Sequence, residues 1–597
     1  MLLLALALAC STHQTPAPDP APPTPPAPVK AGLVTPVFGP LVDGGPRPGV
    51  VSVIQEVTLN GKTAKVTFQP LLETGVTYEG KVFGELVDEN GEPMPWPEDR
   101  DAGGAENRLC NVGDFGSLIV AHDQLFHLGH MECAVGGVSI TPLTQTDDGG
   151  LTAGAPQMVD LKEVHGTSTP CSGIVTPWNT HLASEEYDAN ARLAGKDGLL
   201  EADQMDMAKK HPSEWSFHNR HLAYRADISP YDYGWIPEIE ITDAKGSTHA
   251  VKHYAMGRFS HELGMVMPDQ RTVYLTDDQY HGGFFAFVAD KKADLSAGTL
   301  YAARWQQKDT DGNAGLDWIS LGHATDAELK KTLFEKRPHF TDLFESADLV
   351  DNACPEGFGR TTTAWGTECL KVLDPLGASR FEARRYAGLV GATTEFTKNE
   401  GLALDAGSGP DDGRLYIAMT KIDVSMLDET DKSMGPEGID YRRTAEQDHV
   451  KLTKNSCGIV FALTTGEAVD SNGDKIDSPW VLRTATPTVV GTMIEGGCAP
   501  DGIANPDNLT FIDDYGLLVI GEDTSQHDAD TLWVIDPRKG GPLIPIMRVD
   551  KGSEVTGVHW FSDINGWSYL TVSNQWDDSD WPAHKTVMGV LGPFPAR

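Results

Sequence analysis

The sequence is poor in basic residues, with 47 Lys and Arg against 86 Asp and Glu among 597 residues, a formal net charge of −39. Nucleic-acid binding depends on clustered cations, so this balance argues against a nucleic-acid partner. The apolar run of the first ten residues is too short to cross a bilayer as a helix, and no later run is long and apolar enough to do so. Because 40% of the residues are hydrophobic, disorder is excluded as well. Glycine and proline are abundant, at 62 and 39 residues, and both interrupt helices, so we expect many short strands.

The N-terminus has the pattern of an exported protein. Residues 1–10, MLLLALALAC, have the length of the apolar core of a signal peptide. Their last four residues resemble the lipobox of bacterial lipoproteins, so Cys10 is predicted to carry a lipid; an ordinary signal peptide with an incidental cysteine is the alternative. Residues 11–30 are rich in proline and predict an extended tether. We therefore expect a periplasmic, outer-membrane-anchored or cell-surface protein, with residues 31–597 as one domain.

The cysteines predict a disulfide framework. If Cys10 carries lipid and one other cysteine stays free, six remain, and an oxidising compartment would join them. Six thiols allow fifteen pairings, which the sequence alone does not separate. Pairing of neighbours leaves Cys171 free and predicts the bonds Cys110–Cys133, Cys354–Cys369 and Cys457–Cys498.

A strand pattern recurs along the chain. Each copy has a polar residue, an alternating apolar segment, a turn, and a second strand that ends in polar residues, which is the signature of a hairpin. Repeated antiparallel units predict an all-β fold, a β-propeller of six blades or of five, with loop or helical insertions at 190–225 and 424–450. A β-sandwich or two smaller β domains is the alternative. The copies lie at 260–278, 399–420, 506–523 and 556–574, and 176–186 resembles half of a fifth.

The repeat has a consequence for chemistry. The inner strands of a propeller surround one axis, so equivalent residues of different blades converge. Alignment of the copies places Glu400 opposite Asp507 and near Glu262. Further acids end the strands, namely Glu185 and Glu186, Asp277 and Asp278, and Glu522 and Asp523. Carboxylates packed together raise one another's pKa unless cations neutralise them, and oxygen ligands suit hard cations. The repeat therefore predicts a metal site, with solvated turns as the alternative for any single acid.

Four segments carry a specific combination of residues. They are CSGIVTPWNTHLASEE at 171–186, GRFSHE at 257–262, EFTKNEG at 395–401 and NPDNLTF at 505–511. In this order and spacing they resemble the PhoX-type alkaline phosphatases, over about residues 130–575. The resemblance implies a secreted six-bladed propeller that hydrolyses phosphomonoesters with two ferric and several calcium ions.

The resemblance also implies roles for single residues. Cys171 matches the family's iron-bound thiolate, and Glu262 and Glu400 match its glutamate ligands. The family's T-R-P-E motif reads Thr397-Lys398-Asn399-Glu400 here, so a lysine without the bidentate fork of arginine would hold the phosphate. The predicted metal ligands are Cys171, Glu185, Glu186, Glu262, Glu400, Asp507 and Asn508, with Asp501 as the alternative to Asp507. The predicted catalytic residues are Lys398, Glu400 and Cys171, with Lys398 also binding substrate.

The function predicted from these observations is hydrolysis of phosphomonoesters at a centre of Fe³⁺ and Ca²⁺, where the ions polarise phosphoryl oxygens. Two other functions stay open. One is a non-catalytic surface propeller that binds a ligand, which the changes at Lys398 and Asn399 favour. The other is a calcium-dependent phosphodiesterase or lactonase, because a fold does not fix a function. We expect a monomer whose partner is a small phosphate ester and whose membrane contact is the lipid on Cys10.

Overall fold

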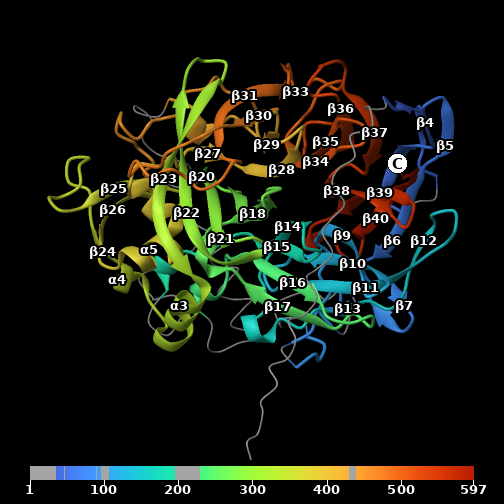
Figure 1. Ribbon diagram of the computed structural model, residues 1–597, viewed down its shortest axis with the longest axis horizontal. Helices are drawn as coiled ribbons and strands as arrows, with labels where there is room; N and C mark the ends of the chain where they lie inside the picture. Colours follow the sequence, from blue (N-terminus) through green and yellow to red (C-terminus); the bar gives the residue numbers. More distant parts are fainter. Residues whose placement is uncertain are drawn as a thin grey trace, which may run out of the picture. The chain divides into compact units, whose positions relative to one another are not determined.

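The computed structural model describes residues 35–45, 48–88, 90–95, 107–194, 229–428 and 439–596. They belong to the compact unit Leu33–Arg597. In this part of the chain, antiparallel sheets form six blades around a common axis, which confirms the predicted six-bladed, all-β propeller (Figure 1). The predicted signal peptide, the lipid site at Cys10 and the tether lie outside the described residues. No described helix is both long and apolar enough to cross a membrane.

The first three blades follow one another along the chain, and each begins with its innermost strand. Their strands are, for blade one, β9 (Gly113–Ala121), β10 (Gln124–Met131), β11 (Gly137–Gln145), β12 (Leu151–Ala153) and β13 (Gln157–Met158); for blade two, β14 (Pro170–Val175), β15 (His181–Glu185), β16 (Pro237–Ile241) and β17 (Thr248–Lys252); and for blade three, β18 (His261–Val266), β19 (Thr272–Asp277), β21 (Phe284–Lys291), β22 (Asp294–Gln307) and β23 (Ala314–Thr325).

The last three blades repeat the plan, but two of them recruit N-terminal strands. In blade six, β40 pairs with β6, and in blade five, β37 pairs with β3. The strands are, for blade four, β28 (Asn399–Asp405), β29 (Arg414–Met419), β30 (Ile459–Thr465) and β31 (Leu482–Val490); for blade five, β34 (Pro506–Ile512), β35 (Leu517–Glu522), β36 (Thr531–Ile535), β37 (Ile544–Val549), β3 (Val50–Ile54) and β2 (Leu41–Asp43); and for blade six, β38 (Glu554–Ile564), β39 (Trp567–Gln575), β40 (Val587–Pro595) and β6 (Thr67–Glu73).

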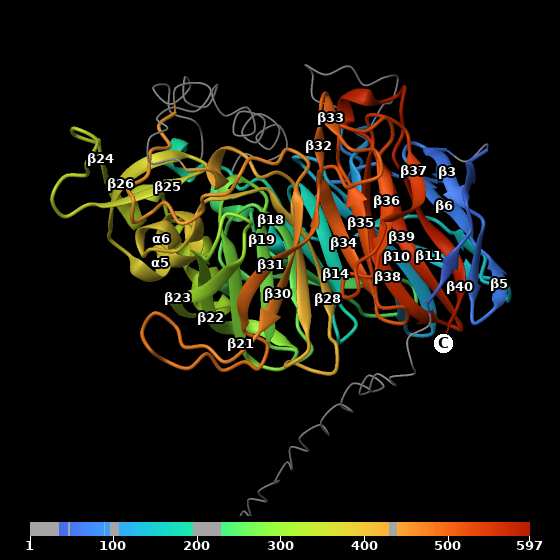
Figure 2. The same cartoon turned by 90° about the horizontal axis from the view of Figure 1, so that it is seen from above.

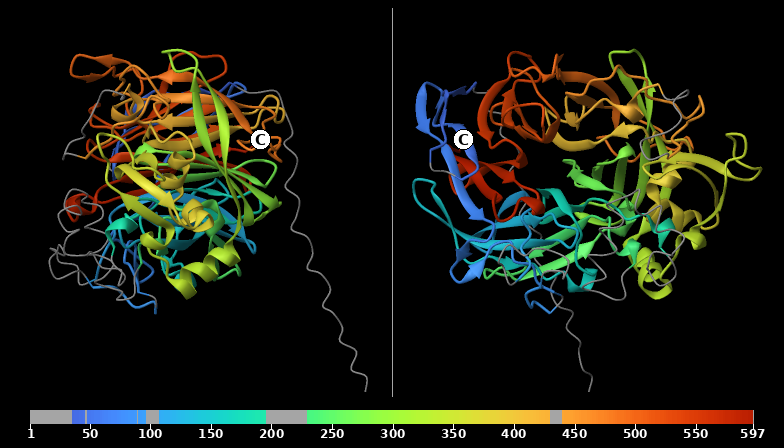
Figure 3. Two further views of the ribbon diagram at one scale, coloured as in Figure 1. Left: turned by 90° about the vertical axis from the view of Figure 1, so that its left-hand side faces the viewer. Right: turned by 180° about the vertical axis from the view of Figure 1, so that it is seen from behind.

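The inner strands close into a ring. Strands β9, β14, β18, β28, β34 and β38 contact one another in this order, and β38 returns to β9. Figure 3 shows the blades surrounding their axis from behind. Because each blade lies between two neighbours, middle strands such as β19 and β35 are buried along their whole length, and β35 begins with the continuous apolar run LLVI rather than with an alternating pattern.

An insertion between blades three and four carries the helices. It was not among the predicted insertions; of those, residues 195–225 and 429–438 lie outside the described residues. Helices α5 and α6 lie beside β25 and β26 in Figure 2. The elements of this insertion are α3 (Asp326–Lys331), the π-helix η5 (Thr332–Lys336), α4 (Phe340–Leu343), β24 (Phe344–Ala347), β25 (Gly359–Thr363), β26 (Gly366–Val372), α5 (Pro375–Phe381), α6 (Ala383–Leu389) and β27 (Phe396–Thr397).

Short elements complete the described chain, and they lie outside the repeating plan of the blades. The strands are β1 (Val37–Phe38), β4 (Glu56–Leu59), β5 (Lys62–Lys65), β7 (Thr77–Tyr78), β8 (Lys81–Val82), β20 (Tyr280–Gly282), β32 (Met493–Ile494) and β33 (Gly497–Cys498), and the 3-10 turns are η1 (Lys162–Val164), η2 (Ala191–Leu193), η3 (Pro230–Asp232), η4 (Tyr254–Met256), η6 (Val424–Met426) and η8 (Asp578–Asp580).

The disulfides confirm the pairing of neighbours. The structure contains Cys110–Cys133, Cys354–Cys369 and Cys457–Cys498, with S–S distances of 2.00, 2.02 and 2.01 Å. Among the described cysteines, Cys171 alone is free, and it is buried. Structural disulfides are typical of proteins that fold in oxidising compartments.

A buried imidazole makes the stability of blade two depend on pH. His253, 3% exposed, lies between Glu238, with Nε2 2.7 Å from Oε2, and Asp326, with Nδ1 3.0 Å from Oδ2. Burial would lower the pKa of His253, but the hydrogen bonds to Asp326 and Glu238 outweigh it and raise this pKa to about 10. The protonated imidazole therefore stabilises the folded state fully below the ordinary pKa of about 6.5, and this stabilisation is lost as the pH rises towards 10.

We therefore expect His253→Gln to destabilise the protein by at most roughly 5 kcal/mol at pH 6, with the difference from the wild type shrinking as the pH approaches 10. Urea unfolding of both proteins across this pH range measures it. A difference that stays constant with pH would contradict a protonated His253.

Candidate metal centre

The inner hairpin of each blade has the same bulge at the same end. In every blade, two residues of the inner strand oppose one of its partner, as between Pro170 and Gly173 on β14 or between His261 and Gly264 on β18. A bulge bends the strand and redirects a side chain. The residue inside the bulge therefore points out of the blade at equivalent places around the axis.

The bulges bring acids and a thiol to one end of the axis. The first bulge residue is an acid or a cysteine in five blades and a glycine in the sixth, in the order Asp114, Cys171, Glu262, Glu400, Asp507 and Gly557. The corresponding positions on the neighbouring strand are Glu132, Glu186, Asp278, Thr420, Asp523 and Asn574. Six repeats of one backbone device thus build one shared site.

Three overlapping groups of these side chains form what we call the thiol–acid cluster. Within each group the ligand atoms lie within 4.8 Å of one another: Asp114, Glu132 and Cys171; Cys171, Glu186 and Glu262; and Glu262, Asp278 and Glu400. Cys171 and Glu262 each belong to two groups. A separate group, which we call the Asp507 group, consists of Asp507, Asp523 and Glu554.

The structure places most of the predicted ligands in these groups. Cys171, Glu186, Glu262 and Glu400 lie in the thiol–acid cluster, and the Cys171 thiol donates a hydrogen bond to Glu262 at 3.0 Å. Asn508 lies beside the Asp507 group, where its Nδ2 donates to Asp507 Oδ1 at 2.5 Å and its Oδ1 accepts from the Gly557 amide at 2.9 Å.

Glu185 is the predicted ligand that the structure places apart. Among the described residues, it belongs neither to the thiol–acid cluster nor to the Asp507 group. Its Oε1 pairs with Lys252 at 2.9 Å, and its Oε2 accepts hydrogen bonds from the amides of Gly234 and Trp235. Adjacent residues of a strand point to opposite sides, so Glu186 reaches the axis while Glu185 is held inside blade two.

Three members of the thiol–acid cluster and the Asp507 group were not predicted from the sequence: Asp114, Glu132 and Glu554. Asp278 and Asp523 were recognised as acids at strand ends but not as ligands. For Asp114 and Glu132 a signal exists, because GDFGSLIV at 113–120 and HLGHME at 127–132 follow the plan of the other copies. Glu554 lies before the repeating unit of blade six, and no pattern indicates it.

Burial and mutual repulsion keep these acids from ionising together without a cation. Burial raises the pKa of Asp114 to about 7, and burial and the charge of Asp114 raise that of Glu132 to about 8. Burial and Asp278 likewise raise the pKa of Glu400 to about 8. Burial and the surrounding carboxylates also hold the pKa of the Cys171 thiol well above its ordinary value. A group of this kind requires either protons or metal ions.

Unpartnered oxygens favour metal ions. Asp114 Oδ1, Glu186 Oε1, Glu262 Oε1 and Asp278 Oδ1 are buried and have no hydrogen-bond partner. Buried polar atoms are nearly always hydrogen-bonded, so four orphans in one cluster indicate a missing ligand. A thiol with six carboxylates is also a donor set that metals bind. The residues therefore fit a metal centre.

Comparison with known families matches residues 142–566 to the family described as alkaline phosphatase PhoX. The chain belongs to this family. A comparison with curated protein sequences finds no match. The match includes Cys171, Glu262, Glu400 and Asp507, whereas Asp114 and Glu132 precede it.

Among solved structures, Pseudomonas fluorescens PhoX in complex with vanadate, a transition-state analogue, covers 91% of this chain and 97% of its own, with 17% identity and a TM-score of 0.56. This likeness supports the propeller fold. A gluconolactonase from Xanthomonas campestris covers 93% of this chain and 98% of its own at 11% identity, but its TM-score of 0.30 is too low to support an inference.

Lys398, where the family's motif has arginine, lies beside the thiol–acid cluster. Its Nζ is 3.1 Å from Asp278 Oδ2 and 2.8 Å from Glu400 Oε1, and its side chain is 21% exposed. In the described part of the chain, no other basic side chain pairs with the cluster. Asn399, where the motif has proline, is buried; it accepts from the Asp277 amide and donates to the Gly283 carbonyl. It therefore fixes blade four to blade three.

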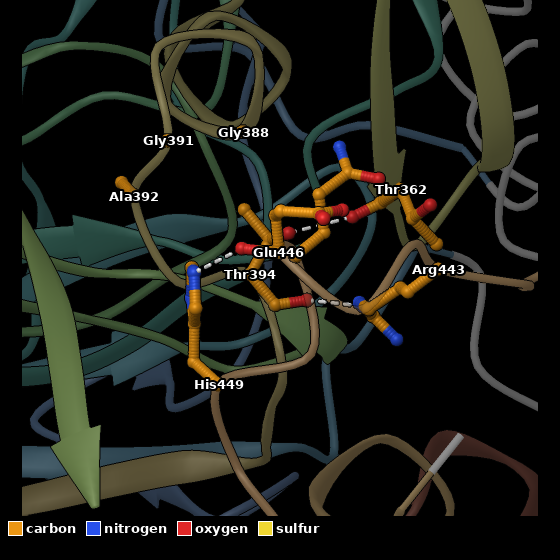
Figure 4. A pocket seen from close by; sticks show the side chains of 9 residues that line it. Thr362, Gly388, Gly391, Ala392, Thr394, Arg443, Glu446 and His449 are labelled. Carbon is orange, nitrogen blue, oxygen red and sulfur yellow. Dashed lines mark hydrogen bonds between the residues drawn. The ribbon is translucent and has the colours of Figure 1, made fainter. Parts of the chain in front are cut away.

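A small cavity lies away from the cluster, beside α6 (Figure 4). It measures about 20 Å³, which is room for about one water molecule. Arg443 Nη2 donates to the Thr394 carbonyl, and His449 Nε2 bonds the Glu446 carbonyl. No cluster residue lines this cavity, so it is not the place where a phosphate ester would bind.

Proposed function

We propose that this chain is a metal-dependent phosphatase that cleaves phosphomonoesters at the thiol–acid cluster. The observation that carries the proposal is a buried thiol among six carboxylates, with four unpartnered oxygens and one lysine as counter-ion. Membership of the alkaline phosphatase PhoX family supports it. The vanadate bound by the Pseudomonas fluorescens protein supports phosphoryl transfer in particular.

The donor types suggest which metals bind where. Thiolate ligands select transition metals, and carboxylates suit both ferric iron and calcium. Cys171, shared by two groups, would hold iron, and the all-oxygen group of Glu262, Asp278 and Glu400 and the Asp507 group would hold calcium. When bound, such ions polarise phosphoryl oxygens and activate an attacking oxygen.

The chain's own residues would orient the substrate and balance its charge. The Lys398 ammonium, partly exposed at the edge of the cluster, would contact the phosphate and stabilise the negative charge of the transition state. Asp278 and Glu400 hold this ammonium in place. Of the remaining acids of the cluster, Asp114, Glu186 and Glu262 are buried and Glu132 is half-buried, so the inner strands around them limit contact with bulk water.

Export is part of the proposal. The three disulfides are those expected in an oxidising compartment. We infer that the protein acts in the periplasm or at the cell surface as a monomer, held there by a lipid on Cys10.

The proposal is tested by elemental analysis and a substrate panel on the full-length protein, purified without chelators. Iron and calcium, together with turnover of p-nitrophenyl phosphate and little turnover of bis-p-nitrophenyl phosphate or a lactone, would support it. Metal without turnover of any substrate would favour a binding propeller. Calcium without iron, with turnover of the diester or lactone, would favour the calcium-dependent hydrolases.

Lys398→Met is expected to lower kcat/KM for a phosphomonoester by about 10²-fold to 10³-fold, because the group that stabilises the charge is lost. Metal content should stay close to the wild type, since a lysine does not ligate here. Lys398→Arg should retain most activity. An unchanged kcat/KM in Lys398→Met would exclude Lys398 as a substrate ligand.

A further inference from the structure

A series of hydrogen bonds between buried side chains ends at the backbone carbonyl of Cys171. His130 Nδ1 is 2.5 Å from the Cys171 carbonyl oxygen, His130 Nε2 is 2.6 Å from His181 Nε2, and His181 Nδ1 is 2.8 Å from Ser117 Oγ. All three side chains are fully buried. These hydrogen bonds join β9 and β10 of blade one to β14 and β15 of blade two.

The direction of each hydrogen bond follows from its acceptor. A carbonyl oxygen only accepts, so His130 Nδ1 carries a proton. Both rings are fully buried, and neither makes a hydrogen bond or ion pair with a carboxylate of the described residues that would stabilise a second proton, so each ring holds one proton. His130 Nε2 therefore accepts from His181 Nε2, and His181 Nδ1 accepts from the Ser117 hydroxyl. Every donor in this series of hydrogen bonds therefore points toward Cys171.

Cys171 needs this bond because of the bulge. The β14–β15 register shifts between Pro170 and Gly173, so Cys171 lies inside the bulge and outside the regular ladder. A buried backbone carbonyl there requires another partner. His130 supplies it, and by fixing the Cys171 peptide it also fixes the direction of the Cα–Cβ bond and of the thiol.

The rings themselves have little freedom. His130 and His181 meet edge to face, with centroids 4.8 Å apart and planes at 88°, and Phe115 packs against both. His181 thus fixes the orientation of the His130 ring and, by donating to His130 Nε2, keeps the proton of His130 on Nδ1. This is the arrangement by which outer residues orient a metal ligand.

We propose that His130, held by His181 and Ser117, is a positioning residue that aims the Cys171 thiolate at the metal site. The proposal rests on the proposed function, because it assumes that Cys171 ligates a metal. It adds that the ligand is placed from blade one, through its backbone, by residues outside the cluster.

The test is titration of the metal-depleted full-length protein with Co²⁺, followed by thiolate-to-metal absorption. His130→Leu removes the donor and should weaken Co²⁺ affinity about 10-fold to 100-fold. His130→Asn places an amide N–H near the position of Nδ1 and should restore most of the affinity. The control is His127→Leu, on the same strand and equally buried, which makes no hydrogen bond to Cys171 in the described structure and should leave the affinity unchanged.

The outcomes separate the two proposals. Equal affinity and absorption in the wild type and His130→Leu would overturn the role of His130 while leaving metal binding intact. A wild type without thiolate-to-metal absorption would overturn metal binding at Cys171 itself. If His130→Leu does not fold, His181→Phe is the second variant. It keeps the hydrogen bond from His130 to the Cys171 carbonyl but removes the hydrogen bond that holds the His130 ring in place. It should weaken affinity and shift the absorption band, and an unchanged titration would overturn the inference.

Discussion

Replacing Cys171 by serine is expected to remove the transition metal from the thiol–acid cluster and to lower phosphatase kcat/KM by about 10³-fold or more. Cys171 is the one thiol of the cluster and belongs to two of its three groups, so its loss removes a metal ligand from both groups. A metal that polarises the phosphoryl group contributes several kcal/mol to the transition state, and each 1.36 kcal/mol is a factor of about ten.

Metal content per chain and initial rates with p-nitrophenyl phosphate measure this result. Ser172→Ala is the matched control, because Ser172 is the next residue of the same strand and is similarly buried. It should retain both metal and activity. Full activity in a Cys171→Ser protein that contains no transition metal would contradict the proposed mechanism.

Replacing Arg384 by leucine is expected to cost about 3–5 kcal/mol of stability, the range found when one partner of a buried ion pair is removed. Arg384 Nη2 lies 2.6 Å from Asp277 Oδ1 and 2.9 Å from Asp188 Oδ1, and its Nε lies 2.8 Å from Asp277 Oδ2. All three side chains are buried. The variant would leave Asp277 in the interior without a cation, and Asp188 with Arg258 alone, whose Nη1 lies 3.7 Å from Asp188 Oδ2.

Urea unfolding measures this difference. Lys371→Leu is the control, because Lys371 and Glu345 form an exposed pair that should contribute less than about 1 kcal/mol. Since Asp277 directly precedes Asp278, Arg384→Leu should also lower metal content. Equal midpoints for Arg384→Leu and the wild type would show that the two aspartates are protonated or hydrated in the folded protein.

The propeller could be predicted because its repeat is local. Each hairpin between 260 and 574 has its alternation, turn and terminal polar residue within about twenty residues, so equivalent positions could be aligned without knowledge of the fold. Blade one was missed because its inner strand, GDFGSLIVA, has two glycines and its partner, QLFHLGHM, contains histidines in place of aliphatic residues.

The cluster could be predicted only in part, because the sequence does not fix which side of a strand a residue faces. Glu185 and Glu186 are adjacent and chemically alike, and a shift of one residue in register exchanges their directions. The bulge at Pro170–Gly173 decides between them. The partners of the buried charges, such as Lys252 for Glu185, come from distant segments, and no local pattern connects them.

The pairing of β6 with β40 sets the order in which the chain can mature. Blade six needs residues 67–73 and residues 587–595 at once, so its sheet is incomplete until residues 587–595 have been synthesised. Until then Asp114 of blade one has no neighbouring blade at β38, and the cluster remains open to water. A contact between the two ends of a long chain forms slowly, so in the exported metal-dependent phosphatase proposed above, metal binding would be a late event of folding, in the compartment to which the protein is exported. The supply of metal ions in that compartment would then decide which ions it carries.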